Sequence, residues 1–248
     1  MPSLQTAQEK LVSHREIWLR KPLLRRLYQE YYRRLVDMLP QKAQRVVELG
    51  GGSGNLKASI PDVISTDIVF CRWLDTILDA QAMPFLENRI DAFVGVDVLH
   101  HIEHPLRFFR EAERCLCPKG RILLIDPFVS PLSYVVFKLF HSEPLNMSQD
   151  FFGEPSTHGS LPKDPWDANL AMATVLFWRE RAAFQSLFPR LRIIHLETFD
   201  WVWPLSGGFT SLTLVPDRWG DWLCRIGRWE LANSVSAFHT LVAIEKVA

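Results

Sequence analysis

The sequence predicts an α/β fold in which a doubly wound, mostly parallel sheet carries helices on both faces. Short apolar runs of strand length alternate with helical patterns between residues 46 and 126. The first run leads into a glycine-rich turn, and other runs end in an acidic residue. The chain has 248 residues, of which 48% are hydrophobic and 23% charged, and this composition is typical of one globular domain with a sizeable core.

The N-terminal segment carries the positive charge of an otherwise neutral chain. Residues 1–45 contain ten Lys or Arg against four Asp or Glu, whereas the formal net charge of the whole chain is zero. From Pro22 to Met38 apolar residues recur at three- and four-residue steps, which predicts an amphipathic helix that ends near Pro40. Its basic face either lies in solvent while the helix packs on the domain, or contacts a membrane surface or an acidic substrate. A basic stripe alone does not make a nucleic-acid surface, and we expect no nucleic-acid partner.

The glycine-rich turn follows the apolar run at Val46 and is the feature around which the chain is organised. From Glu48 to Gly54 it reads acid-x-Gly-x-Gly-x-Gly, with glycines at Gly50, Gly52 and Gly54. Glycine accepts positive φ and has no Cβ, so a ligand can lie against the backbone, and we expect a cofactor site here. The dinucleotide-binding pattern does not fit, because its third glycine would fall on Asn55. A glycine-rich turn in an unrelated α/β protein is the alternative.

A second apolar run, residues 63–67, ends in Asp67, 19 positions beyond Glu48. A carboxylate at the tip of the neighbouring strand can accept hydrogen bonds from both ribose hydroxyls of a nucleoside cofactor. Asp67 is therefore the predicted ribose ligand, and the adjacent Ile68 is a further candidate cofactor residue. A surface carboxylate that merely caps a strand is the alternative.

Two further runs extend the predicted core. Residues 78–85 are expected to form a short strand that runs into a turn, where Asp79 would accept the adenine amine and the Ala80 N–H would donate to a ring nitrogen. Residues 90–99 are almost entirely apolar, as expected of a strand buried on both faces. This strand contains Asp97, another candidate cofactor residue.

The remaining elements follow the same alternation. A helix from Pro105 is expected to close at the turn 118–120, before a strand at 121–126. Later elements are a helix at 131–141, a loop rich in Pro, Gly, Ser and Asp at 142–167, a helix at 168–188, and strands at 191–196 and 237–247. Long loops of this kind are commonly functional lids. The insertion between the last two strands is rich in tryptophan: Trp201, Trp203, Trp219, Trp222 and Trp229.

The cysteine pattern and the hydropathy indicate a reducing compartment. The chain contains no C-x-x-C pair, so we expect reduced, mostly buried thiols at Cys71, Cys115, Cys117 and Cys224. No stretch reaches the roughly 18 consecutive apolar residues of a membrane span, and no secretory signal is evident. We expect a cytoplasmic protein; the sequence gives no indication of its oligomeric state.

Several motifs together carry a family resemblance. They are, in order, Glu48 to Gly54, Asp67, Asp79-Ala80 with Met83-Pro84-Phe85, Val98-Leu99-His100-His101, and Glu111 to Arg114 followed by Leu116 to Gly120. This series resembles the ubiquinone/menaquinone-methyltransferase-like branch of the class I S-adenosyl-L-methionine (SAM)-dependent methyltransferases over residues 40–127. Lys119 stands where that branch usually has a glycine. The second half resembles a bacterial methyltransferase subgroup of unknown substrate.

The resemblance implies a Rossmann-like fold of seven strands, the last antiparallel, and SAM as cofactor, with S-adenosyl-L-homocysteine (SAH) as product. We expect a single domain made of N-terminal helices (1–40), a SAM-binding core (41–127), a lid insertion and helix (128–190), and final strands with the Trp-rich insertion (191–248). The cofactor candidates are Glu48, Gly50, Gly52, Gly54, Asp67, Ile68, Asp79, Ala80 and Asp97.

Two histidines, His100 and His101, directly follow the strand that should end beside the SAM methyl group. An imidazole has an unperturbed pKa near 6.5 and suits a general base, and we favour His101 slightly as the inward one. The alternative is that both imidazoles only orient the loop. His141, Glu143 and Trp203 are candidate acceptor-binding residues, with an exposed polar turn as the alternative for the first two. Because SAM carries an already activated methyl group, we expect no metal.

The expected function is methyl transfer to a small, partly apolar acceptor, such as a natural product or a lipid-linked or saccharide intermediate. Nucleobase methyltransferases of similar fold carry an Asn/Asp-Pro-Pro-aromatic motif where this chain has Asp97 to His100. The Trp-rich insertion is either packing or an aromatic wall for an apolar acceptor. The alternative function is that of a SAM-binding, catalytically inactive partner subunit.

Overall fold

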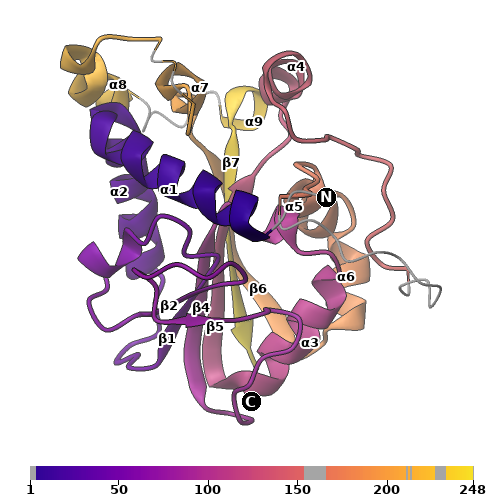
Figure 1. Cartoon of the computed structure of the whole chain (residues 1–248). Helices are drawn as coiled ribbons and strands as arrows, with labels where there is room; N and C mark the ends of the chain where they lie inside the picture. The colour runs from indigo at the N-terminus through magenta and orange to yellow at the C-terminus, as the bar shows by residue number, and fades with distance from the viewer. Residues whose placement is uncertain (1–3, 154–165, 211, 213, 227–232, 248) are drawn as a thin grey trace.

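The computed structural model describes residues 4–153, 166–210, 212, 214–226 and 233–247. Its seven strands form one sheet in the order β3-β2-β1-β4-β5-β7-β6 (Figure 1). The strands are β1 (Val46–Leu49), β2 (Ile64–Asp67), β3 (Thr76–Ile77), β4 (Ile90–Val96), β5 (Leu116–Pro127), β6 (Leu191–Phe199) and β7 (His239–Lys246). All pairings are parallel except those of β7, which is antiparallel to both β5 and β6. The predicted sheet, with its last strand antiparallel, is confirmed.

Helices cover both faces of this sheet (Figure 1). They are α1 (Leu4–Arg20), α2 (Pro22–Asp37), α3 (Pro105–Cys115), α4 (Pro131–Phe140), α5 (Met172–Thr174), α6 (Arg181–Leu187), α7 (Trp203–Ser206), α8 (Gly220–Ile226) and α9 (Asn233–Ser236). Helices α3, α5 and α6 share one apolar core with the sheet, while α2 and α8 share another with its opposite face. The described helices include none that combines the length and apolar content of a membrane span.

The strand residues alternate between the two cores. Phe93 and Ile122 pack on the side of α3, whereas their neighbours Val94 and Leu123 pack on the side of α2, and all four are fully buried. A strand covered on both faces must be apolar at every position, since successive side chains point to opposite faces. This explains the continuous apolar runs from which the strands were predicted.

The strand order reverses between β1 and β4. The chain passes from β1 outward to β2 and β3, and then returns to the other side of β1 as β4. The connections that leave β1 and β4 at their carboxyl ends therefore diverge, and open α/β sheets bind ligands in the crevice formed there. The glycine turn follows β1, and the two adjacent histidines lie just beyond β4.

Three predicted elements have different limits. The strand expected at 78–85 lies earlier, at β3, because Thr76 and Ile77 are the residues that pair with β2. Strand β5 begins directly after α3, so the turn expected at 118–120 is a bulge within the strand, where Lys119 has a φ of 65°. The helix expected at 168–188 is divided by a π-helical turn, Val175–Arg179.

The N-terminal helix α2 packs as part of the core. Its apolar face is buried by Leu23, Leu24, Leu27, Tyr28, Tyr31, Tyr32 and Leu35. The ammonium group of Lys21 is also buried and donates hydrogen bonds of 2.8 Å to the carbonyls of Ser206 and Gly208. These bonds connect the start of α2 to the Trp-rich insertion. Among the cysteines, Cys71 and Cys115 are buried free thiols and Cys117 is a half-buried one; nothing is described for the side chain of Cys224.

Candidate functional site

The glycine turn after β1 has the backbone conformation that the sequence predicted. Gly50, Gly52 and Gly54 all have positive φ, between 48° and 72°. A Cβ added to Gly50 would lie 2.4 Å from the Val98 side chain, so only glycine allows the loop after β4 to approach this closely. A Cβ on Gly52 would lie 3.7 Å from the Gly50 carbonyl oxygen and 3.8 Å from Leu11 Cδ2, which are ordinary contact distances, so Gly52 is not crowded and its nearest side chain is that of Leu11.

Asp67 lies at the tip of β2 and contacts the turn directly. Its Oδ2 accepts a hydrogen bond of 3.0 Å from the Gly52 N–H, and its Oδ1 accepts one of 2.9 Å from the Val69 N–H. Burial raises the pKa of this carboxyl, while these backbone donors act in the opposite direction. The structure therefore places the predicted ribose ligand against the turn that it was expected to serve.

The other predicted cofactor residues differ in burial. Glu48 is buried on β1 and accepts a hydrogen bond from the Ser65 hydroxyl; burial raises its pKa to about 7, although the Ser65 bond lowers it. Ile68 is exposed beyond β2. Asp79 is exposed and accepts a hydrogen bond of 2.8 Å from the Gln81 N–H, so Asp79 and Ala80 stand at a turn on the rim of the same sheet edge.

Asp97 is the centre of a polar network that the sequence did not reveal. Its Oδ2 accepts a hydrogen bond of 2.6 Å from the Tyr28 hydroxyl, and its Oδ1 lies 3.1 Å from His239 Nε2. His239 also lies 3.5 Å from Asp200 through Nδ1, and the Tyr31 hydroxyl donates to Asp200. Burial alone would lower the pKa of His239 and raise that of Asp97; their mutual attraction reverses both, to about 9 and about 2.

His100 and His101 form the 3-10 turn Leu99–His101 after β4, and their rings lie 4.2 Å apart. His100 is almost fully buried, and its Nδ1 lies 3.0 Å from Asp126 Oδ1 at the end of β5. Its Nε2 faces Glu143 Oε2 at 3.5 Å, and His101 Nε2 faces the other oxygen of Glu143 at 3.9 Å. The structure thus joins the two predicted bases to Glu143, which the sequence had assigned only to acceptor binding. We call His100, His101, His141 and Glu143 the imidazole cluster.

Charge within the imidazole cluster is strongly coupled. Burial lowers the pKa of His100, but Asp126 and Glu143 outweigh this and raise it to about 10. Burial raises the pKa of Glu143, but the surrounding imidazoles lower it to about 2. Attraction between the His100 imidazole and the carboxyl groups of Asp126 and Glu143 therefore outweighs the effect of burial within this cluster.

His141 and Trp203 complete the predicted acceptor side. His141 Nδ1 lies 3.8 Å from Glu143 Oε2, and the His141 ring lies 5.9 Å from that of Trp203. Trp203 packs on Phe137 and Phe238, so it has a packing role as well as a place beside the cluster. Of the other predicted aromatic residues, Trp219 and Trp222 are exposed; Trp229 and much of the predicted lid (154–165) lie outside the described residues.

Sequence reasoning missed the residues that cover the glycine turn. Leu11 of α1 reaches to 3.8 Å from the position of a Gly52 Cβ, and Arg15 donates a hydrogen bond of 2.6 Å to the Ser53 carbonyl. The Trp73 indole donates one of 2.8 Å to the Gly52 carbonyl. None of these residues belongs to a recognisable motif, because their contacts with the turn are made only by the fold.

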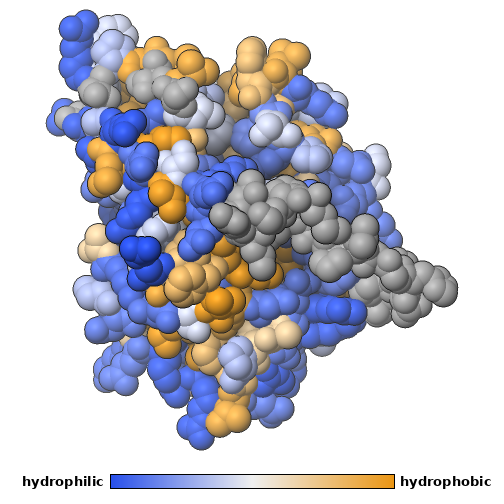
Figure 2. All heavy atoms as spheres, in the orientation of Figure 1, coloured by the Kyte–Doolittle hydropathy of each residue, from blue (hydrophilic) through white to orange (hydrophobic). Residues whose placement is uncertain are grey.

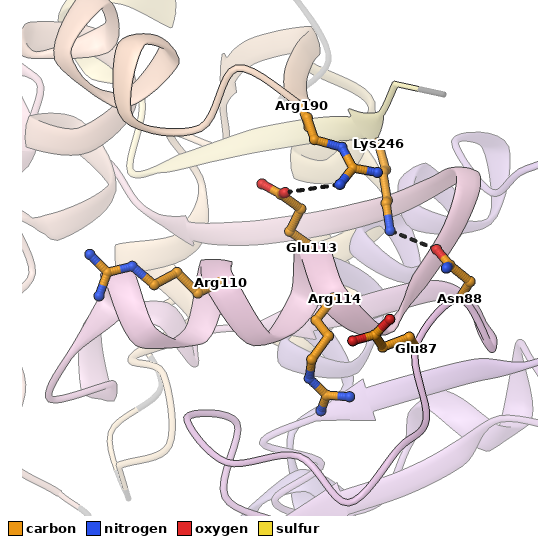
Figure 3. A pocket seen from close by; sticks show the side chains of 7 residues that line it. All are labelled: Glu87, Asn88, Arg110, Glu113, Arg114, Arg190 and Lys246. Atoms are coloured by element: carbon orange, nitrogen blue, oxygen red, sulfur yellow. Dashed lines mark hydrogen bonds and ion pairs between the residues drawn. The ribbon is translucent and has the colours of Figure 1, made fainter.

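A surface depression lies apart from the glycine turn and the imidazole cluster. It is lined by Glu87, Asn88, Arg110, Glu113, Arg114, Arg190 and Lys246 (Figure 3). Lys246 donates a hydrogen bond of 2.8 Å to Asn88, and Arg190 lies 3.8 Å from Glu113. We assign no chemistry to this depression.

Comparisons with known proteins agree with this geometry. The family model described as methyltransferase domain matches residues 23–196, more than half of the chain. This chain belongs to that methyltransferase family. A search of curated proteins gives no match.

Two similar solved structures show the fold. One is a SAM-dependent methyltransferase from Archaeoglobus fulgidus, with 15% identity, a TM-score of 0.53, and 90% of this chain and 94% of that chain covered. The other is the geranyl diphosphate C-methyltransferase from Streptomyces coelicolor A3(2), in complex with Mg²⁺, geranyl diphosphate and SAH. It has 16% identity and a TM-score of 0.52, with 90% and 80% of the two chains covered.

Proposed function

We propose that this methyltransferase-family protein transfers a methyl group from SAM to a small, partly apolar acceptor. The observation that carries the proposal is the placement of the glycine turn and the imidazole cluster beyond the adjacent strands β1 and β4, where the strand order reverses. This crevice is the usual ligand site of an open α/β sheet. It brings a backbone surface for a cofactor next to side chains that can exchange a proton.

The residues of the glycine turn fit the nucleoside and amino-acid parts of SAM. Gly52 presents bare backbone, Asp67 would provide a carboxylate for the ribose, and Asp79 with Ala80 stands at the rim for the adenine edge. Asp97 directly precedes Val98, whose side chain lies against Gly50, so its carboxyl group stands near the glycine turn. As a carboxylate it would attract the cationic end of the cofactor. When bound, SAM supplies an electrophilic methyl group and leaves as SAH.

The imidazole cluster would receive the acceptor. Of the two histidines that follow β4, His101 is the more accessible, with 18% of the side chain exposed against 3% for His100. We assign to His101 the acceptance of a proton from an acceptor hydroxyl, and to His100 the orientation of Glu143. Positioning of the acceptor and exclusion of water would provide the remaining rate enhancement.

An apolar surface next to the cluster supports an apolar or lipid-linked acceptor. Figure 2 shows hydrophobic side chains over α4, which ends one residue before His141. Its exposed apolar side chains are Leu132, Tyr134, Val135, Leu139 and Phe140. An exposed apolar helix that ends in the candidate site is a suitable entrance for such a molecule.

We further place the protein in the ubiquinone/menaquinone-methyltransferase-like branch on its motifs, from Glu48 to Gly120.

Calorimetry with SAH tests the cofactor part of the proposal. Asp67→Ala should weaken binding about 10- to 100-fold, because a hydrogen bond to a charged group contributes about 1.5–3 kcal/mol. Asp62→Ala, which removes an exposed carboxylate just before β2, is the matched control and should leave the affinity unchanged. Equal SAH affinity of the parent and a folded Asp67→Ala variant would refute the assignment, and NADH should not compete.

Labelled SAM tests the transfer itself. The protein should pass the labelled methyl group to a component of a lipid and metabolite extract, in a reaction abolished by SAH. Tight SAH binding without any transfer to such extracts would instead favour the inactive, SAM-binding partner subunit.

A further inference from the structure

The imidazole cluster has the spacing of ligands around one metal ion. Donor atoms of His100, His101 and Glu143 all lie within 4.8 Å of one another. The two imidazole Nε2 atoms lie 3.5 and 3.9 Å from the two oxygens of Glu143, which is longer than a good hydrogen bond. Two atoms that bind one ion tetrahedrally at about 2.1 Å are roughly 3.4 Å apart, so a small inward movement would satisfy an ion between them.

A second carboxylate orients the buried imidazole as metal sites require. His100 Nδ1 pairs with Asp126 Oδ1 at 3.0 Å, which leaves Nε2 directed at Glu143. Asp126 is itself fixed, because the same oxygen accepts a hydrogen bond of 3.1 Å from the Leu99 N–H. Ligating histidines almost always donate their other ring N–H to a carboxylate or carbonyl in this manner.

Backbone hydrogen bonds hold the two ligand-bearing segments together. The Asn169 N–H donates to the His100 carbonyl at 2.9 Å, and the Leu170 N–H donates to the Pro144 carbonyl at 3.0 Å. The segment 169–170 thus ties the turn that carries both histidines to the segment that carries Glu143. The three candidate ligands are positioned by the backbone, and their arrangement does not depend on their mutual attraction alone.

We infer that His100, His101 and Glu143 form a binding site for a divalent transition-metal cation of the zinc class. Two imidazoles and one carboxylate favour Zn²⁺, Fe²⁺ or Co²⁺ over Mg²⁺ and Ca²⁺, which prefer oxygen ligands. The site is buried at His100 and more open at His101 and Glu143, whose side chains are 18% and 19% exposed. A three-ligand site with one open side is the arrangement of catalytic metals.

His141 stands at the open side of this site. Its Nδ1 lies 3.8 Å from Glu143 Oε2 but also accepts a hydrogen bond of 3.3 Å from the Glu143 N–H. That bond occupies Nδ1, the His141 nitrogen nearest to the Glu143 carboxylate, so we leave His141 out of the proposed ligand set.

The role of the ion, though not its binding, rests on the proposed function. An acceptor hydroxyl bound at the open position would lose its proton to solvent, in place of the transfer to His101, because a divalent cation strongly lowers the pKa of a bound oxygen and His101 Nε2 would be occupied as a ligand. The resulting oxygen would form the new O–CH3 bond as the C–S bond breaks and SAH leaves. This would narrow the acceptor to an oxygen nucleophile. It also departs from the expectation of no metal, which considered the chemistry of SAM but not the geometry of the cluster.

Titration with Co²⁺ and Zn²⁺ tests the site without any need for catalysis. The untagged full chain, freed of metal with a chelator, should bind one equivalent of Co²⁺ with a d–d absorption band, and Zn²⁺ should displace it. Zinc at 100 times its Kd should raise the Tm by roughly 5–10 °C for a domain of this size. Magnesium at the same concentration should do neither.

Three variants and one control locate the ion. Glu143→Gln and His101→Ala change partly exposed side chains and should each weaken Co²⁺ binding at least about 100-fold, because each removes a direct ligand. Asp126→Asn should weaken it about 10- to 100-fold through His100. His195→Ala is the matched control, since His195 forms another close His–Glu pair, 3.3 Å from Glu197 on β6. It should leave Co²⁺ affinity unchanged.

The outcomes separate this inference from the proposed function. Binding of Co²⁺ that is absent, or that is equal in the parent and in folded Glu143→Gln, would overturn the metal site and leave the cluster as an acid–base group. SAH affinity reports on the cofactor site independently. Metal binding without SAH binding would leave the metal site standing and overturn the proposed methyl transfer.

Discussion

The two halves of the candidate site are built in different ways. The cofactor half, from Glu48 to Asp67, occupies 20 consecutive residues and presents mainly backbone. The acceptor half is the imidazole cluster with Asp126, which brings together the ends of β4, β5 and α4 and is tied by segment 169–170. A site made of local backbone leaves a glycine pattern in the sequence. A site made of distant side chains leaves only scattered histidines and acids.

The electrostatics of the halves differ as well. In the cofactor half, burial raises the pKa values of Glu48 and Asp67, and no cation compensates fully. In the acceptor half, neighbouring imidazoles lower the pKa of Glu143 to about 2 in spite of burial. The first half is therefore prepared for hydrogen-bond donors such as hydroxyls. The second holds a fixed pairing of charges that can exchange a proton or accept a cation.

Removal of the His101 imidazole should give the largest effect, a loss of turnover without a loss of cofactor binding. His101→Ala is expected to lower turnover at saturating SAM about 100- to 10,000-fold, as typical for loss of a group that handles a proton. SAH affinity measured by calorimetry should stay within about threefold, because His101 belongs to the acceptor half. A folded variant that retains more than a tenth of the parent rate would show that this imidazole is not essential.

Substitution in the glycine turn should have the converse effect. Gly52→Val places a β-branched side chain at a φ of +48° and on the backbone surface that we propose for the cofactor, so SAH affinity should fall at least about 100-fold. Co²⁺ binding to the imidazole cluster should not change. Gly153→Ala, at a glycine with ordinary φ, is the control; SAH affinity of Gly52→Val equal to that of this control would contradict the assignment.

The contact between the halves can be tested through stability. Gly50→Ala should lower the free energy of unfolding by about 2–3 kcal/mol, since its Cβ would meet the Val98 side chain at 2.4 Å and its φ is +62°. The double variant with Val98→Ala removes the Cγ2 contact at 2.4 Å and leaves the contact with the Cβ of residue 98 at 2.9 Å. Urea denaturation of the four members of this cycle should give a coupling energy near 1 kcal/mol or above. Strict additivity would show that the two loops do not press on each other.

The Asp97–His239 pair predicts a dependence of stability on pH. Because the pKa of His239 is raised from 6.5 to about 9, its contribution is complete below pH 6.5 and is lost as the pH rises through 9. Because the pKa of Asp97 is lowered to about 2, its contribution is lost only as the pH falls below its ordinary value toward 2. The His239 contribution to the unfolding free energy should drop by up to about 3 kcal/mol between pH 6 and 9, in addition to that of His100, whose pKa is raised to about 10, and His239→Gln should remove the His239 part of the slope. An equal slope in both proteins would contradict the pairing.

A substitution in the surface depression should give the smallest effect on stability and binding. Arg190→Ala removes a half-exposed partner that lies 3.8 Å from Glu113, and surface ion pairs contribute at most about 1 kcal/mol. Unfolding free energy, SAH affinity and turnover should all remain close to those of the parent. A substantial loss of SAH affinity would indicate that the cofactor binds near Arg190, and would contradict its assignment to the glycine turn.

Most of the fold was predictable because its signals are local. The strands β1, β2 and β4 are short apolar runs, and the glycines at 50, 52 and 54 have the positive φ that their pattern predicted. Errors occurred where pairing overrides propensity. Strand β3 is set by the two residues that meet β2, and the bulge at Lys119 is set by the register between β4 and β5.

What the sequence alone determined is the parallel sheet, the glycine turn, the position of Asp67 beside it, and the presence of histidines after β4. Each follows from the order of residues within a short window, where the backbone has few choices. Only the tertiary structure decided that Glu143 faces both His100 and His101, that Asp126 orients the first of them, and that Tyr28 and His239 hold Asp97. These contacts join residues 26 to 142 positions apart, and the packing of a whole sheet against its helices is required to bring them together.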